Sequence, residues 1–283
     1  MNVRSRSLIV AALTIAVAGL AASAAAASFA GKNGRIYFAS NLEPTGFFTD
    51  IFSMRPNGTD LEPVRMRADW QRNPTVSPNG RWIAFHSYPE YDGTFPEEDL
   101  AMTIRGKKLR PIADAPSFVR NGVEVWPSVN PGSSPMNPAY SSDGTRMAWV
   151  QDDGTEEDPD LNIWAARTDG GDPRQLTDHP GNEGPPDFAP NGRRLAYATT
   201  TTNSGFDIFD VRFTGKNTRR LTHGERGQFA PDYSPDGRKI VFMAGHGENP
   251  DIFRMSASGK NEHPVTNRFG FIAEPDWGRR PRR

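Results

Sequence analysis

Apolar residues alternate along five short segments of the chain, and each segment follows a glycine. The paired apolar positions are Ile36 and Phe38, Ile83 and Phe85, Met147 and Trp149, Leu195 and Tyr197, and Ile240 and Phe242. The residues between them are also mostly apolar, which predicts β-strands that are buried on both faces. A further strand is predicted in every segment, at residues 50–54, 99–103, 162–166, 207–211 and 251–255.

The same five segments share a turn and a shorter, last strand. The turn glycines are Gly58, Gly106, Gly170, Gly215 and Gly259, and the apolar residues of the last strand are Val64, Ile112, Leu176, Leu221 and Val265. The spacing from glycine to apolar residue is six in every segment, as hairpins of constant register require. Four segments also open with a short strand that begins at Pro74, Pro138, Pro186 and Pro231, at intervals of 64, 48 and 45 residues. Four strands in about 40–50 residues is the period of a β-propeller blade.

The two ends of the repeat array complement one another. The sequence Pro-Asp-Trp-Gly at 275–278 matches the opening strand of a segment, and the first segment lacks such a strand. We therefore expect the C-terminal strand to supply the innermost strand of the first blade, so that the ring has no open sheet edge. The sequence thus predicts an all-β propeller of four-stranded blades over residues 31–278, with five blades by repeat count and six as the alternative.

Residues 1–27 predict a signal peptide, because a positively charged start precedes an apolar run from Leu8 to Leu20 and an Ala-rich cleavage site before Ser28. An uncleaved N-terminal anchor is the alternative. The chain has no cysteine, which excludes disulfides, thiolate metal sites and a lipid anchor at a lipobox cysteine. We expect a periplasmic or secreted protein without a transmembrane segment after signal removal, and a basic tail at 279–283.

Residues 231–242, Pro-Asp-Tyr-Ser-Pro-Asp-Gly-Arg-Lys-Ile-Val-Phe, and the Leu-Thr pairs at 176–177 and 221–222 resemble the WD-like repeat of the TolB family. The resemblance covers about residues 31–278 and implies a propeller with a central channel and a protein-binding role. The sequence departs from TolB itself in lacking the preceding α/β domain and in having five repeats rather than six blades. A role in a Tol–Pal-type envelope system therefore stays open. Prolyl-oligopeptidase-like peptidases carry a related repeat, but their α/β-hydrolase domain has no counterpart here.

Composition narrows the function classes. Lys and Arg number 33 against 34 Asp and Glu, and this balance gives no support for binding to nucleic acid. No Gly-x-Ser-x-Gly nucleophile elbow is present. We expect a monomeric, non-catalytic scaffold that binds a protein or peptide partner in the cell envelope or outside the cell. The alternatives are a carboxylate-dependent hydrolase or lyase at the channel mouth, and a calcium-stabilised structural module.

The long connections are expected on one face of the ring. These are the loops between the second and third strands, the loops between blades, and an insertion at 115–137 that carries aromatic residues. Long loops on a rigid repeat scaffold are typical binding surfaces. The candidate binding residues on this face are Phe118, Trp126, Glu156, Glu157, Asp158, His179 and His223.

Three aspartates, Asp187, Asp232 and Asp276, share one position in the innermost strand of successive blades. They are candidates for a ring of carboxylates at the channel mouth, and the alternative is that each hydrogen-bonds a neighbouring blade. No cofactor is indicated, and no set of metal ligands is identified. The clustered acidic residues of the loops make calcium the cation to test, with a solvated charged face as the alternative.

Overall fold

In the computed structural model, the described residues are 30–41, 49–65, 70–88, 98–111, 119–120, 123–124, 136–155, 159–168, 170–201, 205–224, 226–245, 250–267 and 272–281. They form β-strands and turns, and within these ranges no helix is long and apolar enough to cross a membrane. The expected signal peptide lies outside the described residues.

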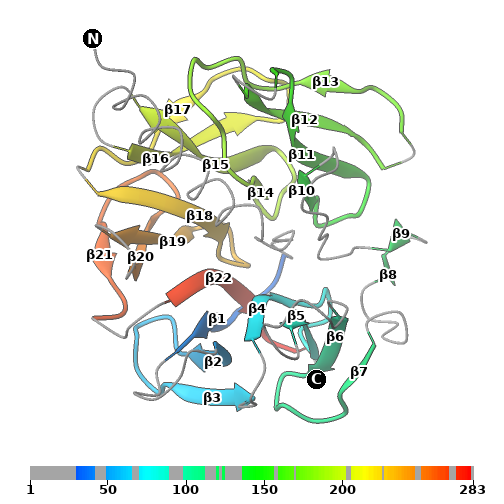
Figure 1. Ribbon diagram of the computed structural model, residues 1–283, viewed down its shortest axis with the longest axis vertical. Helices are drawn as coiled ribbons and strands as arrows, with labels where there is room; N and C mark the ends of the chain where they lie inside the picture. Colours follow the sequence, from blue (N-terminus) through cyan, green and yellow to red (C-terminus); the bar gives the residue numbers. More distant parts are fainter. Residues whose placement is uncertain are drawn as a thin grey trace.

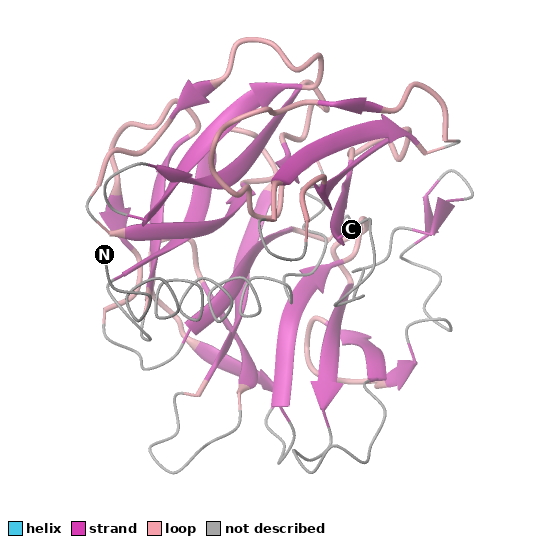
Figure 2. Ribbon diagram, turned by 45° about the horizontal axis from the view of Figure 1, so that its top comes forward, coloured by secondary structure: helices cyan, strands magenta, loops and turns pink. Residues whose placement is uncertain are grey.

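Five four-stranded antiparallel sheets surround a common centre as the blades of a propeller (Figures 1 and 2). From the innermost to the outermost strand, blade 1 is β22 (Ile272–Arg279), β1 (Asn33–Ser40), β2 (Asp50–Met54) and β3 (Glu62–Arg65), and blade 2 is β4 (Trp70–Val76), β5 (Trp82–Tyr88), β6 (Glu98–Thr103) and β7 (Arg110–Pro111). Blade 3 is β10 (Met136–Tyr140), β11 (Arg146–Asp152), β12 (Leu161–Arg167) and β13 (Arg174–Gln175), and blade 4 is β14 (Asp187–Phe188), β15 (Arg194–Thr201), β16 (Gly205–Arg212) and β17 (Arg219–Arg220). Blade 5 is β18 (Gly227–Tyr233), β19 (Lys239–Gly245), β20 (Asp251–Ser256) and β21 (His263–Pro264), and the insertion between blades 2 and 3 holds a small hairpin of β8 (Val119–Arg120) and β9 (Val123–Glu124). The predicted five-bladed propeller is confirmed.

The C-terminal strand closes the ring, as the sequence predicts. Strand β22 pairs antiparallel with β1, and Trp277 lies opposite Ile36. The strand includes Arg279, one residue beyond the expected end of the propeller, and the Arg279 guanidinium donates to the backbone carbonyl of Pro78 at 2.8 Å. The first residue of the expected basic tail is therefore part of a blade.

Apolar side chains fill the spaces between adjacent blades. One buried cluster joins blades 3 and 4 around Phe188 and Tyr197. Another joins blades 5 and 1 around Val241 and Phe38. Both faces of the second strand contribute, because Ile36 faces one neighbouring blade and Ala39 the other. Burial on both faces explains the continuous apolar runs of the second strands.

Backbone conformation explains the constant spacing of the outer hairpins. Each turn between the third and fourth strands has a glycine in the left-handed region, such as Gly215 with φ of 74°, and a second left-handed residue two positions later, such as Asn217 with φ of 56°. Glycine adopts this conformation without steric cost. The same pair of conformations recurs in all five blades, which fixes one register for every outer hairpin.

The connections divide between two faces of the ring. We call the face with the loops between second and third strands, and between blades, the loop face. The opposite face, which carries the short turns between first and second and between third and fourth strands, is the turn face. The turn face is uniform because its turns repeat one another.

Candidate binding site on the loop face

The three aspartates of the innermost strands lie buried between blades. The Asp187 carboxylate accepts a hydrogen bond from the backbone N–H of Tyr233 at 2.7 Å, and Asp232 accepts one from Trp277 at 2.6 Å. Asp276 accepts from the backbone N–H of Val76. Each bond joins one blade to the next, so these carboxylates connect blades 4, 5, 1 and 2. These contacts correspond to the second of the two sequence-based alternatives.

The channel beside these aspartates is narrow. Its cavity measures about 20 Å³ and is lined chiefly by the prolines that open the blades, Pro74, Pro186, Pro231 and Pro275. This space is sufficient for about one water molecule. Of the three aspartates, Asp276 lines this cavity, which among the described residues has no room for a saccharide or peptide.

Burial changes the protonation of the channel carboxyls. It raises the pKa of Asp232 to about 7, although the N–H of Trp277 opposes the shift. Burial, with a smaller contribution from the charge of Asp232, raises the pKa of Asp276 well above its usual range. The pKa of Glu274, also buried, is raised to about 7, and the nearby Arg72 counteracts part of this shift. These carboxyls therefore take up protons in a pH range where exposed carboxyls are ionised.

A larger opening lies on the loop face between blades 3 and 4, and we call it the loop-face cleft. Its volume is about 680 Å³, which is in the range of ligand-binding pockets. The acidic loop of blade 3, the connection between blades 3 and 4, and the end of β15 form its walls. The lining residues are Gly154, Thr155, Pro159, Asp160, Pro180, Gly181, Asn182 and Thr200.

The acidic loop is held in place by its own carboxylates. One oxygen of Asp152 accepts from the backbone N–H groups of Gly154 and Asp160, both at 3.0 Å. The Asp153 carboxylate accepts from the indole N–H of Trp164 at 2.7 Å. Two of the acidic residues at the base of the loop thus have a structural role, whereas the exposed Asp160 lines the cleft.

The opposite wall of the cleft is tied to both blades. The Asn182 side-chain oxygen accepts from the backbone N–H of Leu161 in blade 3 at 3.3 Å. The backbone N–H of Asn182 donates to the Thr200 hydroxyl of blade 4 at 3.0 Å. Gly181 lies against Thr200, since a Cβ at this glycine would stand 2.5 Å from the Thr200 carbonyl oxygen. This wall is therefore rigid, and it requires glycine at position 181.

Glu183 lies next to this wall and is only 2% exposed. Burial raises the pKa of its carboxyl to about 8, and the nearby hydroxyls of Thr177 and Thr199 counteract part of this shift. The negative charges of Asp160 and Asp178 add to the increase. A cluster of three carboxyl groups thus lies at the cleft, and the buried one is largely protonated at neutral pH.

The repeat explains why Thr177 is available to Glu183. In blade 4 the equivalent Thr222 hydroxyl accepts from the backbone N–H of Ile208 at 2.9 Å and lies 3.1 Å from the Asp207 carboxylate. In blade 3 the position of that aspartate is Asn162. Glu183 was not among the candidates from the sequence. The signal that could have found it is Asn162, which stands in blade 3 where blade 4 has Asp207 beside the threonine of its Leu-Thr pair.

The structure places the two candidate histidines in different surroundings. His179 is half-buried in the connection between blades 3 and 4, and its ring lies 6.0 Å from that of Phe209. His223 is exposed after β17. In the part of the chain that the structure describes, no hydrogen bond or ring contact joins the two. The other candidates on this face, Phe118, Trp126, Glu156, Glu157 and Asp158, lie outside the described residues.

The described residues contain no group of three His, Asp or Glu side chains arranged to hold a metal ion. The loop-face cleft offers the negative charge of Asp160 and polar backbone groups. Such a lining suits a cationic side chain of a partner.

Comparison with known proteins agrees with the repeat. A family model described as the TolB beta propeller domain matches residues 120–282. Hydrazine synthase of Kuenenia stuttgartiensis has a TM-score of 0.63 at 14% identity, over 89% of this chain and 48% of that one. The tricorn protease has a TM-score of 0.55 at 14% identity, over 87% of this chain and 27% of that one. At these identities the two structures show a shared fold.

TolB from Acinetobacter baumannii is 16% identical, with a TM-score of 0.46 over 87% of this chain. The present chain spans 55% of the length of that protein. No curated protein sequence matches the chain.

Proposed function

Because the chain belongs to the family of TolB β-propeller domains, we propose that it is an exported scaffold whose loop face binds a protein or peptide partner. The observation that carries the proposal is the acidic loop-face cleft between blades 3 and 4. Asp160 lines the cleft, and Asp178 is exposed beside the same carboxyl cluster. A lysine or arginine side chain of the partner would offset this concentration of negative charge.

The position of the cleft supports a macromolecular partner. Its walls come from two blades that share one buried core, so the scaffold beneath it is rigid. The connections between blades extend the same face beyond the cleft. A rigid cleft surrounded by longer loops is a common arrangement for recognition of a chain segment.

A short basic peptide serves as a probe of this proposal. Hexa-arginine should bind the protein at low salt, and the double variant Asp160→Asn with Asp178→Asn should weaken binding at least tenfold because it removes both exposed charges. The matched control is Glu62→Gln with Asp172→Asn, which removes two exposed carboxylates of the turn face. Calorimetric titration measures both. Equal loss in the two double variants would contradict the proposal.

A further inference from the structure

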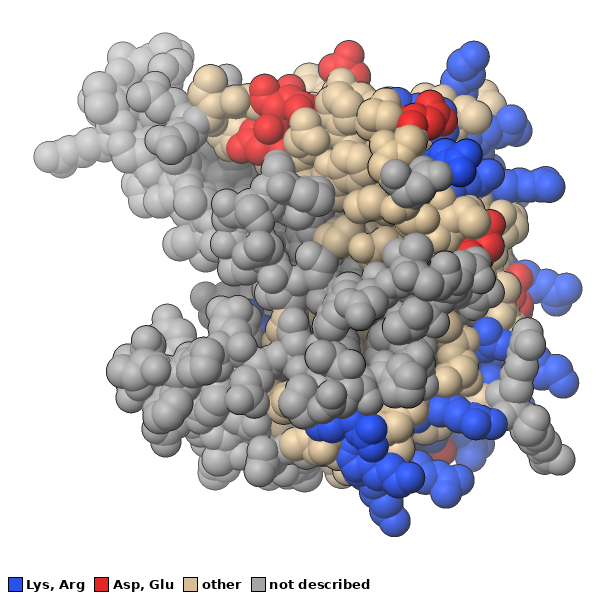
Figure 3. All heavy atoms as spheres, turned by 90° about the vertical axis from the view of Figure 1, so that its right-hand side faces the viewer, with Lys and Arg blue, Asp and Glu red and all other residues tan. Residues whose placement is uncertain are grey.

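Basic side chains gather on the turn face. Figure 3 shows Lys and Arg projecting along one side of the molecule, with a group of Asp and Glu away from that side. Exposed arginines follow the glycine of the turn between first and second strands, at Arg81, Arg193 and Arg238. Others lie at or just after the ends of the third strands, at Arg55, Arg105, Arg167 and Arg212. Among the described residues, exposed arginines are thus concentrated on the turn face.

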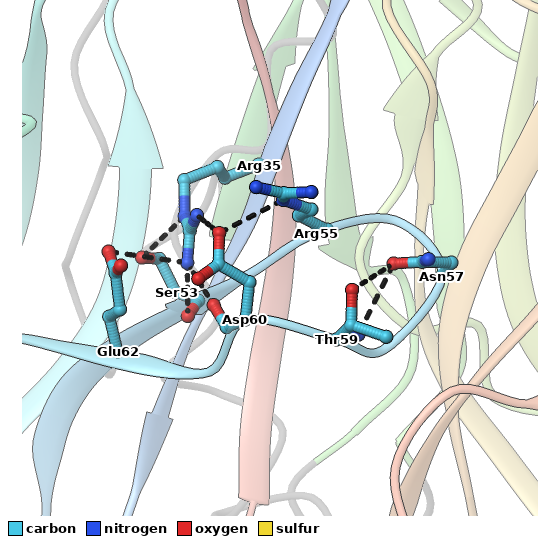
Figure 4. A network of polar contacts seen from close by, with 7 residues as sticks. All are labelled: Arg35, Ser53, Arg55, Asn57, Thr59, Asp60 and Glu62. Atoms are coloured by element: carbon cyan, nitrogen blue, oxygen red, sulfur yellow. Dashed lines mark hydrogen bonds and ion pairs between the residues drawn. The ribbon is translucent and has the colours of Figure 1, made fainter.

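In blade 1 the arginines of this face have carboxylate partners within the blade. Arg35 donates to the Asp60 carboxylate at 2.8 Å and lies 3.5 Å from Glu62 (Figure 4). Arg55 donates to the same Asp60 carboxylate at 2.9 Å. The positive charge of this turn is consequently compensated.

Blades 3 and 4 differ, because a groove of about 840 Å³ between them is lined by six arginines and one aspartate. We call it the arginine groove. Its charged lining residues are Arg146, Arg167, Arg174, Arg193, Arg194, Arg212 and Asp172. Thr145, Asn191 and Thr214 add neutral hydrogen-bonding groups, so the lining is polar and strongly positive.

Part of the groove is preorganised. Phe213 forms its floor, and the guanidinium carbons of Arg146 and Arg174 each lie 4.7 Å from the centre of the Phe213 ring. Arg146 also donates to the carbonyl of Gly192 in blade 4 at 2.8 Å, and Arg174 pairs with Asp172 at 2.8 Å. Stacking on an aromatic face fixes a guanidinium and leaves its edge free to donate.

The remaining charges in the groove are unequally compensated. Arg194 makes two 2.6 Å contacts with the buried Asp210 carboxylate. Arg193 and Arg212 are exposed, and no carboxylate of the described residues pairs with either. Excess positive charge thus remains on the blade 4 side of the groove, opposite the fixed arginines of blade 3.

We propose that the arginine groove binds a compact, soluble anion that carries two or more phosphoryl groups. Guanidinium groups match the oxygens of such groups with paired, charge-assisted hydrogen bonds. The volume is that of a small-molecule site, so the ligand must concentrate its charge, and a phosphate monoester brings about −1.5 to −2 charges per group at neutral pH. Arginines on both walls require at least two such groups to span the groove.

Calorimetric titration with inorganic tripolyphosphate tests this site. The double variant Arg193→Ser with Arg212→Ser should weaken binding at least tenfold. The control variant Arg105→Ser with Arg238→Ser removes the same charge from exposed positions of the turn face outside the groove and should change binding less than twofold. Thermal melting of both variants confirms that they are folded.

Three results would overturn the inference. These are the absence of tripolyphosphate binding at low salt, an equal loss of binding in the groove and control variants, and binding of citrate as tight as that of tripolyphosphate. The last outcome would indicate a general anion site without preference for phosphoryl groups. The loop-face cleft is separate, so Asp160→Asn with Asp178→Asn should leave tripolyphosphate binding intact.

Discussion

The Asp232 carboxylate accepts a hydrogen bond from the backbone N–H of Trp277 at 2.6 Å, and this bond connects blade 5 to the strand that closes the ring. Asp232 is 1% exposed and Trp277 is 3% exposed. A hydrogen bond to a buried backbone group contributes to stability mainly because its loss leaves a donor without a partner. The contact therefore couples ring closure to a single side chain.

Replacing Asp232 by alanine should destabilise the propeller by about 1–3 kcal/mol, because the N–H of Trp277 would lose its acceptor. Asp232→Asn is the control, since its side-chain oxygen retains an acceptor of similar size. Urea unfolding at pH 7 measures the free energy of unfolding of both. An Asp232→Ala protein as stable as the parent would contradict this role.

Deletion of residues 274–283 should open the ring. The truncated chain loses most of β22, including Trp277, which is buried against β1 and blade 5. Strand β1 would then present a free edge, so we expect unfolding or self-association. Analytical ultracentrifugation and thermal melting show the outcome, and a stable monomer with the original melting temperature would be inconsistent with closure by β22.

The fold could be predicted because its signals repeat. The six-residue spacing after each turn glycine reflects two left-handed residues per outer hairpin, and the match of 275–278 to the opening strands indicated the closure. A pattern of period two shows that strands are buried but does not show where Asp187 or Asp232 finds its partner. That partner lies in the next blade, 46 or 45 residues away.

The candidate site was less predictable for the same reason. Glu183 lies in a connection between blades, and its surroundings combine Thr177 with Thr199 from different blades. The arginines of the groove were visible in the sequence, yet only the packing of blade 3 against blade 4 brings Arg174 close to Arg212 in one groove. Residues outside the repeat register are placed by tertiary structure, which no local pattern encodes.

Gly181 should not tolerate alanine. Its Cβ would stand 2.5 Å from the Thr200 carbonyl oxygen and would also meet the Thr200 hydroxyl. We expect a loss of about 1–3 kcal/mol from overpacking, with weaker hexa-arginine binding at the adjoining cleft. Gly184→Ala is the matched control, because the nearest atom to its Cβ would be 3.6 Å away. Similar melting temperatures for the two variants would contradict the rigid wall.

Stability should fall as pH rises from about 5 to 8. Burial raises the pKa of Glu183 from 4.5 to about 8, so in this range the folded state binds a proton that the unfolded state has released, and deprotonation favours unfolding. The shifts of Asp232 and Glu274 act in the same direction. Glu183→Gln removes one of these groups. The melting temperature of this variant, measured at pH 5, 6.5 and 8, should therefore fall less with rising pH than that of the parent protein.

The control for this pH series is Glu62→Gln, at an exposed carboxyl of the turn face. It should leave the pH dependence of the melting temperature unchanged. If Glu183→Gln shows the same pH dependence as the parent protein, the carboxyl of Glu183 does not titrate as this account requires.

Site-specific photo-crosslinking in an extract of the source organism's cell envelope is the most direct test of partner binding at the loop-face cleft. A photoreactive residue replaces Thr155 in the loop-face cleft, and in a second protein it replaces the exposed Ser258 of the turn face. We expect one discrete protein adduct at position 155, absent at position 258, which disappears when Asp160→Asn and Asp178→Asn are introduced. No adduct at position 155, or an adduct that survives these two substitutions, would contradict a partner-binding role for the cleft.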